Sequence, residues 1–415
     1  MINRVKALLF SQTSKDTFIT LIGTGVSAFF GTVFTILLAR SLSPAPFGVY
    51  SSLAAAITII TTLGDLGISS ALVNFLPKMP GKRSKLISAS FYFQSAISAA
   101  FTLLFAAAAF FHQNLIPGSL SSHFLIAALV TGLYILNQYG LGLLRAEKKF
   151  IAASWVLVID SGVKFILVAA LFLFRGLTIG QVLLANSVSV IASTVYALRH
   201  EFRQLSPLFP KVYLRKIFKF AKWIGLARAF SVAVARVDII LLNLLHSSFA
   251  AGIFSAAGRV TLLFTLLVSA LGSVVAPRFS AFVDKKDTLA YLKKLIPLIG
   301  AISLAMIASV LLARPIITIV FGQEYINSIP VFQALGLAMI PFLFSIVTTN
   351  PIIYTFNQPR FFAHITILQV VVLVVLDLIL IPHHGALAPC YSIGVSNLLV
   401  FTLSSVKLAR LLHEA

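Results

Sequence analysis

The chain of 415 residues has little charge and almost no cysteine. Only 10% of its residues are charged and 59% are hydrophobic, with a mean hydropathy of +1.01. Such a composition leaves too little polar surface to cover a soluble particle. The single cysteine, Cys390, excludes an internal disulfide and gives no basis for a thiolate metal cage. The sequence therefore predicts a protein that lies within a membrane.

The sequence also lacks the short motifs that carry known catalytic sites. It contains no GxSxG elbow and no HExxH zinc motif, and its only Gly-Lys-x-Ser string, at 81–84, lacks the upstream glycine of a phosphate-binding loop. The predicted outer loops are too short for a catalytic domain. We therefore expect no enzyme, no catalytic residue, no metal site and no cofactor.

Long apolar runs dominate the remaining sequence. A helix needs about 20 largely apolar residues to cross the hydrocarbon core of a bilayer. Twelve runs meet this requirement, so we predict an all-α integral membrane protein. The predicted spans are 17–39, 49–72, 86–111, 123–144, 151–174, 178–198, 222–245, 252–275, 295–320, 329–356, 361–382 and 385–408.

One phrase occurs in both halves of the chain. Residues 37–54 read LLARSLSPAPFGVYSSLA, and residues 241–258 read LLNLLHSSFAAGIFSAAG, at an offset of 204. Each copy joins two apolar runs through a short polar link, which predicts a duplicated helical hairpin. Internal duplication of membrane helices is typical of secondary transporters, whose substrate lies where the halves meet.

The repeat predicts two six-helix bundles related by pseudo-two-fold symmetry. We assign residues 1–200 to the N-terminal bundle, 201–221 to a basic cytoplasmic linker and 222–415 to the C-terminal bundle.

The net charge of +21 comes from basic residues that alternate between the two sides of the predicted spans. One side, which includes both termini, carries 25 basic residues against three on the other. Positive loops stay in the cytoplasm, so both termini are predicted to be cytoplasmic. The excess charge is therefore suited to membrane lipids rather than to a nucleic acid.

Four further basic residues fall inside predicted spans: Lys164, Arg228, Arg236 and Arg259. A central Arg or Lys costs about 2.5 to 3.5 kcal/mol on insertion and is tolerated beside a partner or a watery cavity. Arg228 and Arg236 are eight residues apart, so they would share a face of the seventh span about 12 Å apart. This set predicts a cationic cavity that binds a diphosphate.

Structural roles compete with this interpretation. Lys164 follows Asp160 by four residues, a spacing that also suits an ion pair within one helix. Arg228 and Arg259 lie near span ends, from which their side chains can reach the headgroups. Arg236 lies nearest the middle of its span, so we favour it as the functional residue.

Four acidic residues also fall inside predicted spans: Asp65, Asp160, Asp238 and Asp377. Carboxylates in membranes pair with cationic side chains or carry coupling protons and cations. We predict one of these two roles for each. Asp65 lies between glycines in the string LGDLGISS, where a role in packing or at a helix end competes.

Phrases along the whole chain resemble those of a known transporter family. They are residues 37–78, GLLRAEKKF at 142–150, VDIILLNLL with AGIFSAAGRV within 237–260, VFGQEYINS at 320–328 and LIPHHGALAP at 380–389. In their order and spacing the chain resembles the oligosaccharide flippases of the polysaccharide-biosynthesis type, within the multidrug/oligosaccharidyl-lipid/polysaccharide (MOP) exporter superfamily.

The resemblance implies two bundles in a V around a central cavity and transport by alternating access in a bacterial or archaeal cytoplasmic membrane. The cargo implied is a polyprenyl-diphosphate-linked oligosaccharide, moved to the outer leaflet for O-antigen, capsule or exopolysaccharide. The four membrane cations would hold the diphosphate. A coupling proton or sodium ion, and the glycosyltransferases or polymerase of the same pathway, are the other partners implied.

Two alternatives stay open on the residues alone. A multidrug exporter of the same superfamily, coupled to protons or sodium, would use the acidic residues to hold an organic cation. A membrane scaffold for glycan assembly that does not transport would use the basic segment 199–222 as a docking surface. The scaffold predicts that neutralising Arg236 changes nothing.

Overall fold

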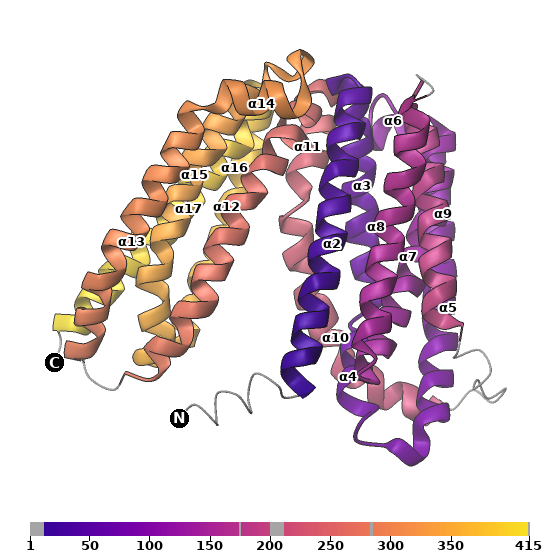
Figure 1. The fold of residues 1–415 in the computed structure, drawn as a ribbon, viewed down its shortest axis with the longest axis horizontal. Coiled ribbons are helices and arrows are strands. Elements are labelled where there is room, and N and C mark those ends of the chain that lie inside the picture. The colour runs from indigo at the N-terminus through magenta and orange to yellow at the C-terminus, as the bar shows by residue number, and fades with distance from the viewer. Residues whose placement is uncertain (1–11, 174–175, 200–210, 283–284, 414–415) are drawn as a thin grey trace. The chain divides into compact units, whose positions relative to one another are not determined.

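A computed structural model describes residues 12–173, 176–199, 211–282 and 285–413. Within these ranges the chain is helical and forms no strand, as the apolar runs predict (Figure 1). The helices up to residue 245 are α2 (Gln12–Ser41), α3 (Pro44–Asp65), α4 (Ile68–Phe75), α5 (Arg83–Ala107), α6 (His112–Leu115), α7 (Ser121–Ala146), α8 (Phe150–Leu173), α9 (Ile179–Leu198), α10 (Lys211–Val234) and α11 (Val237–Leu245). The later helices are α12 (Ser248–Ser280), α13 (Lys285–Leu311), α14 (Ala313–Phe321), α15 (Ser328–Asn350), α16 (Pro359–His384) and α17 (Ala388–His413).

Ten candidate membrane spans are found among the described residues, so the predicted count of twelve is not confirmed. Two features account for the difference. The last candidate, Pro359–His413, contains both α16 and α17, which were predicted as separate spans. The predicted span 222–245 is divided between α10 and α11 by a turn at residues 235–236, and neither helix is among the ten.

The chain packs into two compact units. The first unit comprises residues 1–42 and 52–240, and the second comprises residues 43–51 and 241–415. Helix α3 is therefore shared, because its first two turns pack with the second unit while the remainder packs with the first. The predicted bundle boundaries at 200 and 222 follow the sequence repeat rather than packing, and they stay a prediction. Of the predicted linker 201–221, residues 201–210 lie outside the described residues, and residues 211–221 form the start of α10.

In both copies of the repeated phrase two helices are joined by a short link, as predicted. In the first copy α2 ends at Ser41 and α3 begins at Pro44, and in the second α11 ends at Leu245 and α12 begins at Ser248. The backbone bonds of the two turns match. Phe47 N donates to Ser43 O at 3.1 Å, and Ala251 N donates to Ser247 O at 3.1 Å.

The two copies also pack against each other within the second unit. A Cβ atom added to Gly48 would lie 1.8 Å from the carbonyl oxygen of Ser248, and one added to Gly252 would lie 1.8 Å from that of Pro44. Both glycines and both carbonyl residues are related by the offset of 204. The starts of α3 and α12 therefore form a symmetric backbone crossing, which we call the glycine crossing. Only a residue without a Cβ permits this approach.

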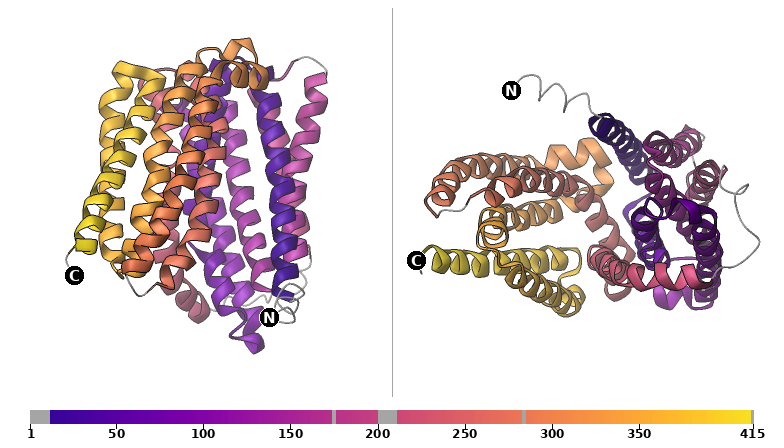
Figure 2. Two further views of the ribbon diagram at one scale, coloured as in Figure 1. Left: turned by 60° about the vertical axis from the view of Figure 1, so that its left-hand side comes forward. Right: turned by 90° about the horizontal axis from the view of Figure 1, so that it is seen from below.

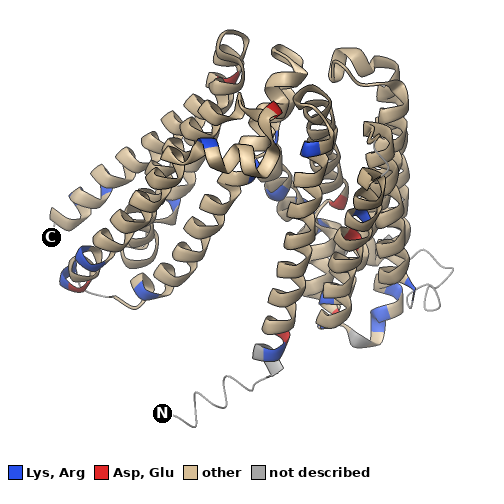
Figure 3. Cartoon of the chain, turned by 45° about the horizontal axis from the view of Figure 1, so that its top comes forward, with Lys and Arg blue, Asp and Glu red and all other residues tan. Residues whose placement is uncertain are grey.

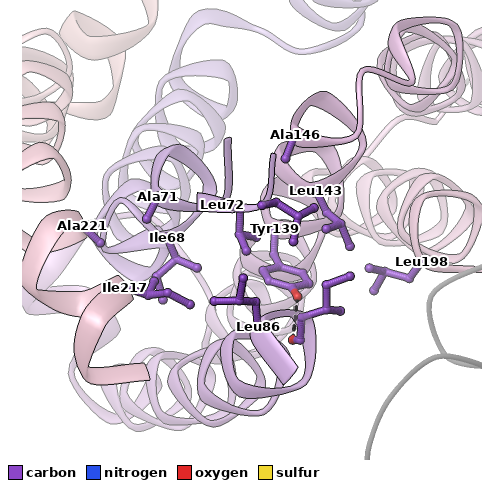
Figure 4. Packing of buried hydrophobic residues seen from close by; sticks show 12 residues of the cluster. Ile68, Ala71, Leu72, Leu86, Tyr139, Leu143, Ala146, Leu198, Ile217 and Ala221 are labelled. Atoms are coloured by element: carbon purple, nitrogen blue, oxygen red, sulfur yellow. Dashed lines mark hydrogen bonds between the residues drawn. The ribbon is translucent and has the colours of Figure 1, made fainter. Parts of the chain in front are cut away.

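In the first unit, α2 packs along α8, and α7 packs between α5 and α9. Figure 2 shows these helices running side by side. A cluster of buried apolar side chains from α4, α5, α7, α9 and α10 forms one part of the core (Figure 4). At its centre the hydroxyl of the fully buried Tyr139 donates to the carbonyl oxygen of Ile87 at 3.1 Å. Burial of Ile217 and Ala221 in this cluster places α10 with the first unit.

In the second unit, α15 packs against α12, α13 and α17, and α16 packs against α17. A second apolar cluster, which includes Phe279, Ile299, Leu343 and Ile352, fills the space between these helices. Leu408 of α17 completes it near the end of the chain. Each unit therefore has its own apolar core.

Candidate functional site

The seventh predicted span is interrupted at Arg236. Helix α10 ends at Val234, Ala235 and Arg236 form a turn, and α11 begins at Val237. The Arg236 amide donates to Ala233 O at 3.1 Å, which closes the turn. The prediction that Arg228 and Arg236 share a face of one continuous helix is therefore wrong. Arg236 is half-buried and lies at the break between two helices.

The break has a consequence for charge near Arg236. Asp238 lies in the first turn of α11, where the positive end of the helix dipole favours a carboxylate, and it is buried. Figure 3 shows that several Lys and Arg residues lie part-way along helices rather than at their ends. Arg236 and Asp238 therefore lie two residues apart at the break, inside the segment 222–245 that was predicted as one continuous helix.

Arg228 faces a carboxylate of the first unit. Its Nη1 lies 3.9 Å from Oδ2 of Asp65, with the Arg228 side chain 50% exposed and that of Asp65 3% exposed. The other carboxylate oxygen of Asp65 accepts hydrogen bonds from the backbone amide of Ser69, at 3.3 Å, and from the Ser69 hydroxyl. Arg228 is thus half-exposed at the surface of the unit, while Asp65 is held within it. Of the two roles predicted for Asp65, the structure shows an ion pair.

The position of Asp65 depends on a break between α3 and α4. Leu66 and Gly67 both have positive φ angles, of 47° and 76°. Helix α10 packs directly onto this break, because a Cβ on Gly67 would lie 2.4 Å from the carbonyl oxygen of Ala221 and one on Gly225 would lie 2.3 Å from the carbonyl carbon of Leu66. Close backbone contact between α10 and the break therefore sets the distance between Arg228 and Asp65.

Lys164 forms the ion pair that its spacing from Asp160 allows. Its Nζ lies 2.8 Å from Oδ2 of Asp160, and both side chains are 17% exposed. The hydroxyls of Tyr134 and Ser189 each donate to Asp160 Oδ1 at 3.1 Å. This network joins α7, α8 and α9. Lys164 therefore balances a carboxylate of its own unit, and its contact with a substrate stays a prediction.

The remaining predicted site residues lie in the second unit. Arg259 is exposed on α12, seven residues after Gly252. Asp377 is fully buried on α16. The structure thus pairs Arg228 with Asp65 and Lys164 with Asp160. Within the described ranges, no group of three or more His, Cys, Asp or Glu residues is arranged to hold a metal ion.

The structure also adds a residue that was counted among the loop charges. Helix α7 extends to Ala146, so Arg145 lies in its last turn rather than in a loop. The Arg145 side chain is exposed there.

Comparisons with known proteins give concordant results. Residues 13–283 match the family model described as polysaccharide biosynthesis protein. A protein of Shigella flexneri named "Putative O-antigen transporter" is 26% identical over 330 residues, which cover 74% of this chain and 78% of that protein.

Solved structures show the same fold at low sequence identity. An inward-facing multidrug resistance MATE family transporter of the MOP superfamily has a TM-score of 0.74 and 15% identity, over 95% of this chain and 98% of that one. The lipid II flippase MurJ in an inward closed conformation has a TM-score of 0.73 and 17% identity, over 94% and 87%. These likenesses establish that the chain shares the all-helical fold of those two proteins. Since the family model covers more than half of the chain, the protein belongs to the polysaccharide biosynthesis protein family.

Proposed function

We propose that this protein is a flippase that moves a polyprenyl-diphosphate-linked oligosaccharide from the cytoplasmic to the outer leaflet of a cytoplasmic membrane. The observation that carries the proposal is the family match over residues 13–283. The relative named as an O-antigen transporter and the fold shared with a lipid II flippase support the same substrate class. O-antigen, capsule or exopolysaccharide is the product class, and both termini face the cytoplasm.

The diphosphate is the part of such a cargo that the basic residues suit. Arginine stays ionised, and its planar fork can hold two phosphate oxygens together. Arg228 is half-exposed, and Arg236 lies at a break between helices, so we place these two first among the contacts. Lys164 would first have to leave Asp160, and Arg259 lies on the second unit.

Coupling to a proton or sodium gradient is assigned to the four membrane acids. Asp65 and Asp160 each face a cation of the same unit, so protonation of either carboxylate, or binding of a sodium ion to it, would leave the charge of that cation unbalanced. Asp238 on α11 and Asp377 on α16 are the other two candidates, and both are buried. Glycosyltransferases or a polymerase of the same pathway would supply and consume the cargo.

The test is flipping of a fluorescent polyprenyl-diphosphate oligosaccharide in liposomes that contain the full-length protein. Wild type is compared with Arg236→Ala and Arg228→Ala, and Arg215→Ala serves as a control because Arg215 is an exposed arginine on the same helix as Arg228. We expect transport by wild type and by Arg215→Ala, and a loss of about tenfold in the other two variants. If the wild-type protein does not move the oligosaccharide, the proposed function is refuted.

The multidrug exporter is the second candidate, because the fold of a MATE family transporter is shared over 95% of the chain. It predicts export of an organic cation from the same liposomes, inhibited by Asp65→Asn or Asp377→Asn and unaffected by Arg228→Ala. A scaffold that does not transport predicts that neither cargo moves.

A further inference from the structure

One side of α10 is fixed against the first unit. Its buried residues are spaced by four and form a stripe along the helix: Ile217, Ala221, Gly225 and Ala229. Figure 4 shows Ile217 and Ala221 beside α4 in the apolar cluster. Two ring contacts strengthen this packing, since Phe220 lies 5.5 Å from Phe75 of α4 and Phe218 lies 6.0 Å from Phe93 of α5, measured between ring centroids. The rotation of α10 about its axis is therefore determined, and its other side faces away from the unit.

This outward side of α10 changes character along the helix. Its exposed basic residues are Arg215, Lys219 and Lys222. The exposed apolar residues that follow are Trp223, Leu226 and Phe230, which are 67%, 49% and 64% exposed. Neighbouring members of this set are three or four residues apart, so they share one side of the helix. The basic part therefore meets the apolar part between Lys222 and Trp223.

No other charge of α10 interrupts this pattern. The helix contains no acidic residue that could offset its basic ones. Its next basic residue after Lys222 is Arg228, which faces Asp65 on the packed side. The outward side thus carries positive charge before residue 223 and apolar surface after it.

Such a change is typical of a helix that crosses the surface of a bilayer. Tryptophan is enriched at membrane interfaces, where its ring lies at the level of the headgroups. The Lys222 ammonium lies 5.1 Å from the centroid of the Trp223 ring, so a cation and an indole lie side by side at the junction. Exposed Leu226 and Phe230 suit acyl chains, whereas exposed Lys219 suits phosphate. The junction is therefore expected at headgroup level, on the side predicted to be cytoplasmic.

We propose that Lys219, Lys222 and Trp223 form a binding site for the headgroup of an anionic membrane lipid in the cytoplasmic leaflet. We call this site the lipid anchor. The two ammonium groups bind the phosphodiester of a lipid such as phosphatidylglycerol, and the indole lies beside it at the same depth. Anionic lipids of the cytoplasmic leaflet are attracted to basic segments of this kind. The site needs no cargo, so this inference goes beyond the proposed function.

The test measures which lipids contact Trp223. The chain has two tryptophans, so Trp155 is replaced by phenylalanine to leave Trp223 as the reporter. The full-length protein is placed in nanodiscs that mix phosphatidylcholine with phosphatidylglycerol, and the acyl chains of one lipid or the other are brominated. Bromine quenches tryptophan fluorescence on contact, so the comparison reports the lipid composition beside Trp223. We expect phosphatidylglycerol to be favoured about fivefold over its share of the bilayer, and less in high salt.

The variants separate the lipid anchor from general attraction by positive charge. Lys219→Ala and Lys222→Ala should each lower the preference about twofold, and the double variant should abolish it. Lys222→Arg should retain it. Arg215→Ala removes the same charge about 10 Å further along the same side of the helix, so it should change the preference less than Lys222→Ala does. Quenching by brominated phosphatidylcholine should be the same in all variants, which checks that Trp223 keeps its position.

Four results would overturn the lipid anchor. The two brominated lipids could quench wild type equally, the double lysine variant could keep the preference, or Arg215→Ala could reduce it as much as Lys222→Ala does. Dissolved iodide could also quench Trp223 where brominated lipid does not, which would show that this side faces water and is open to a soluble acidic partner. Each outcome is read without any cargo, so it leaves the proposed function to its own transport assay.

Discussion

A methyl group added at the glycine crossing should destabilise the second unit. In Gly252→Ala the new Cβ would lie 1.8 Å from the Pro44 carbonyl oxygen and 3.1 Å from the Gly48 amide nitrogen. Ordinary contacts begin at 3.4 Å, so α3 and α12 would have to separate by about 1.6 Å. The obstructing atoms belong to the backbone, which cannot rotate away as a side chain can. Overpacking of this kind costs about 1 to 3 kcal/mol, and we expect the upper end.

Helix α12 supplies a matched control. Gly258 lies on the same helix, and a Cβ there would have nothing within 4 Å. Alanine is favoured over glycine within a helix by up to about 1 kcal/mol, so Gly258→Ala should be neutral or stabilising. Both substitutions replace a glycine of the same helix by alanine, but only the new Cβ at residue 252 clashes with the backbone of α3. Their free energies of unfolding should therefore differ by about 3 to 4 kcal/mol.

The assay uses the single cysteine as a reporter of the second unit. Cys390 is 2% exposed, so a thiol-reactive fluorogenic dye reacts with it when the unit opens. On heating, Gly252→Ala should react about 6 to 12 °C below wild type, and Gly258→Ala should react at or above it. Gly48→Ala should resemble Gly252→Ala, and the double variant should lose less than the sum of the two, because a single separation relieves both contacts. Equal unfolding temperatures for Gly252→Ala and Gly258→Ala would refute the crossing.

Two further predictions concern ion pairs of the first unit. Burial alone would raise the pKa of the Glu147 carboxyl, but hydrogen bonds from Lys149 and Arg83 hold this pKa below its ordinary value of 4.5. The stability that these ion pairs contribute is therefore fully present above about pH 4.5 and is lost as the pH falls below it. Tryptophan fluorescence should therefore show wild type losing stability between pH 5 and pH 3 more steeply than Glu147→Gln does, whereas parallel curves would contradict the pairing. Lys164→Met leaves the Asp160 charge without its ammonium and should cost about 1 to 2 kcal/mol, discounted for partial exposure, while Lys164→Met with Asp160→Asn should recover most of it. The same fluorescence measures this loss, and no recovery in the double variant would show that Lys164 is not there to balance Asp160.

Local patterns in the sequence predicted local features of the fold well. The repeated phrase predicted two helices joined by a short link in each copy, and the spacing of Asp160 and Lys164 allowed the ion pair that the structure shows. Both predictions depend on residues a few positions apart, where helix geometry determines which side chains meet. The contact between the two copies of the phrase could not be predicted in this way, since it joins residues about 200 positions apart.

The site was harder to predict than the helices. The run 222–245 has no proline or glycine at residues 235–236, so no helix-breaking residue marks the point at which the helix stops after Val234. Arg145 lies one residue beyond the predicted span 123–144 and was therefore assigned to a loop. A basic residue in the last turn of a helix is favoured by the helix dipole, so α7 continues through it to Ala146.

The sharing of α3 means that neither half of the chain contains a whole unit. A fragment ending after α9 would lack α10, which covers the break beside Asp65, while carrying residues 43–51, which belong to the second unit. The complementary fragment would carry α10 and would lack one side of the glycine crossing. Each half of the chain thus contributes a segment to the unit formed mainly by the other half, as in a domain-swapped dimer. We expect each fragment to be unstable when expressed alone and the pair to assemble when expressed together, so that the duplicated halves behave as obligate partners rather than as independent domains.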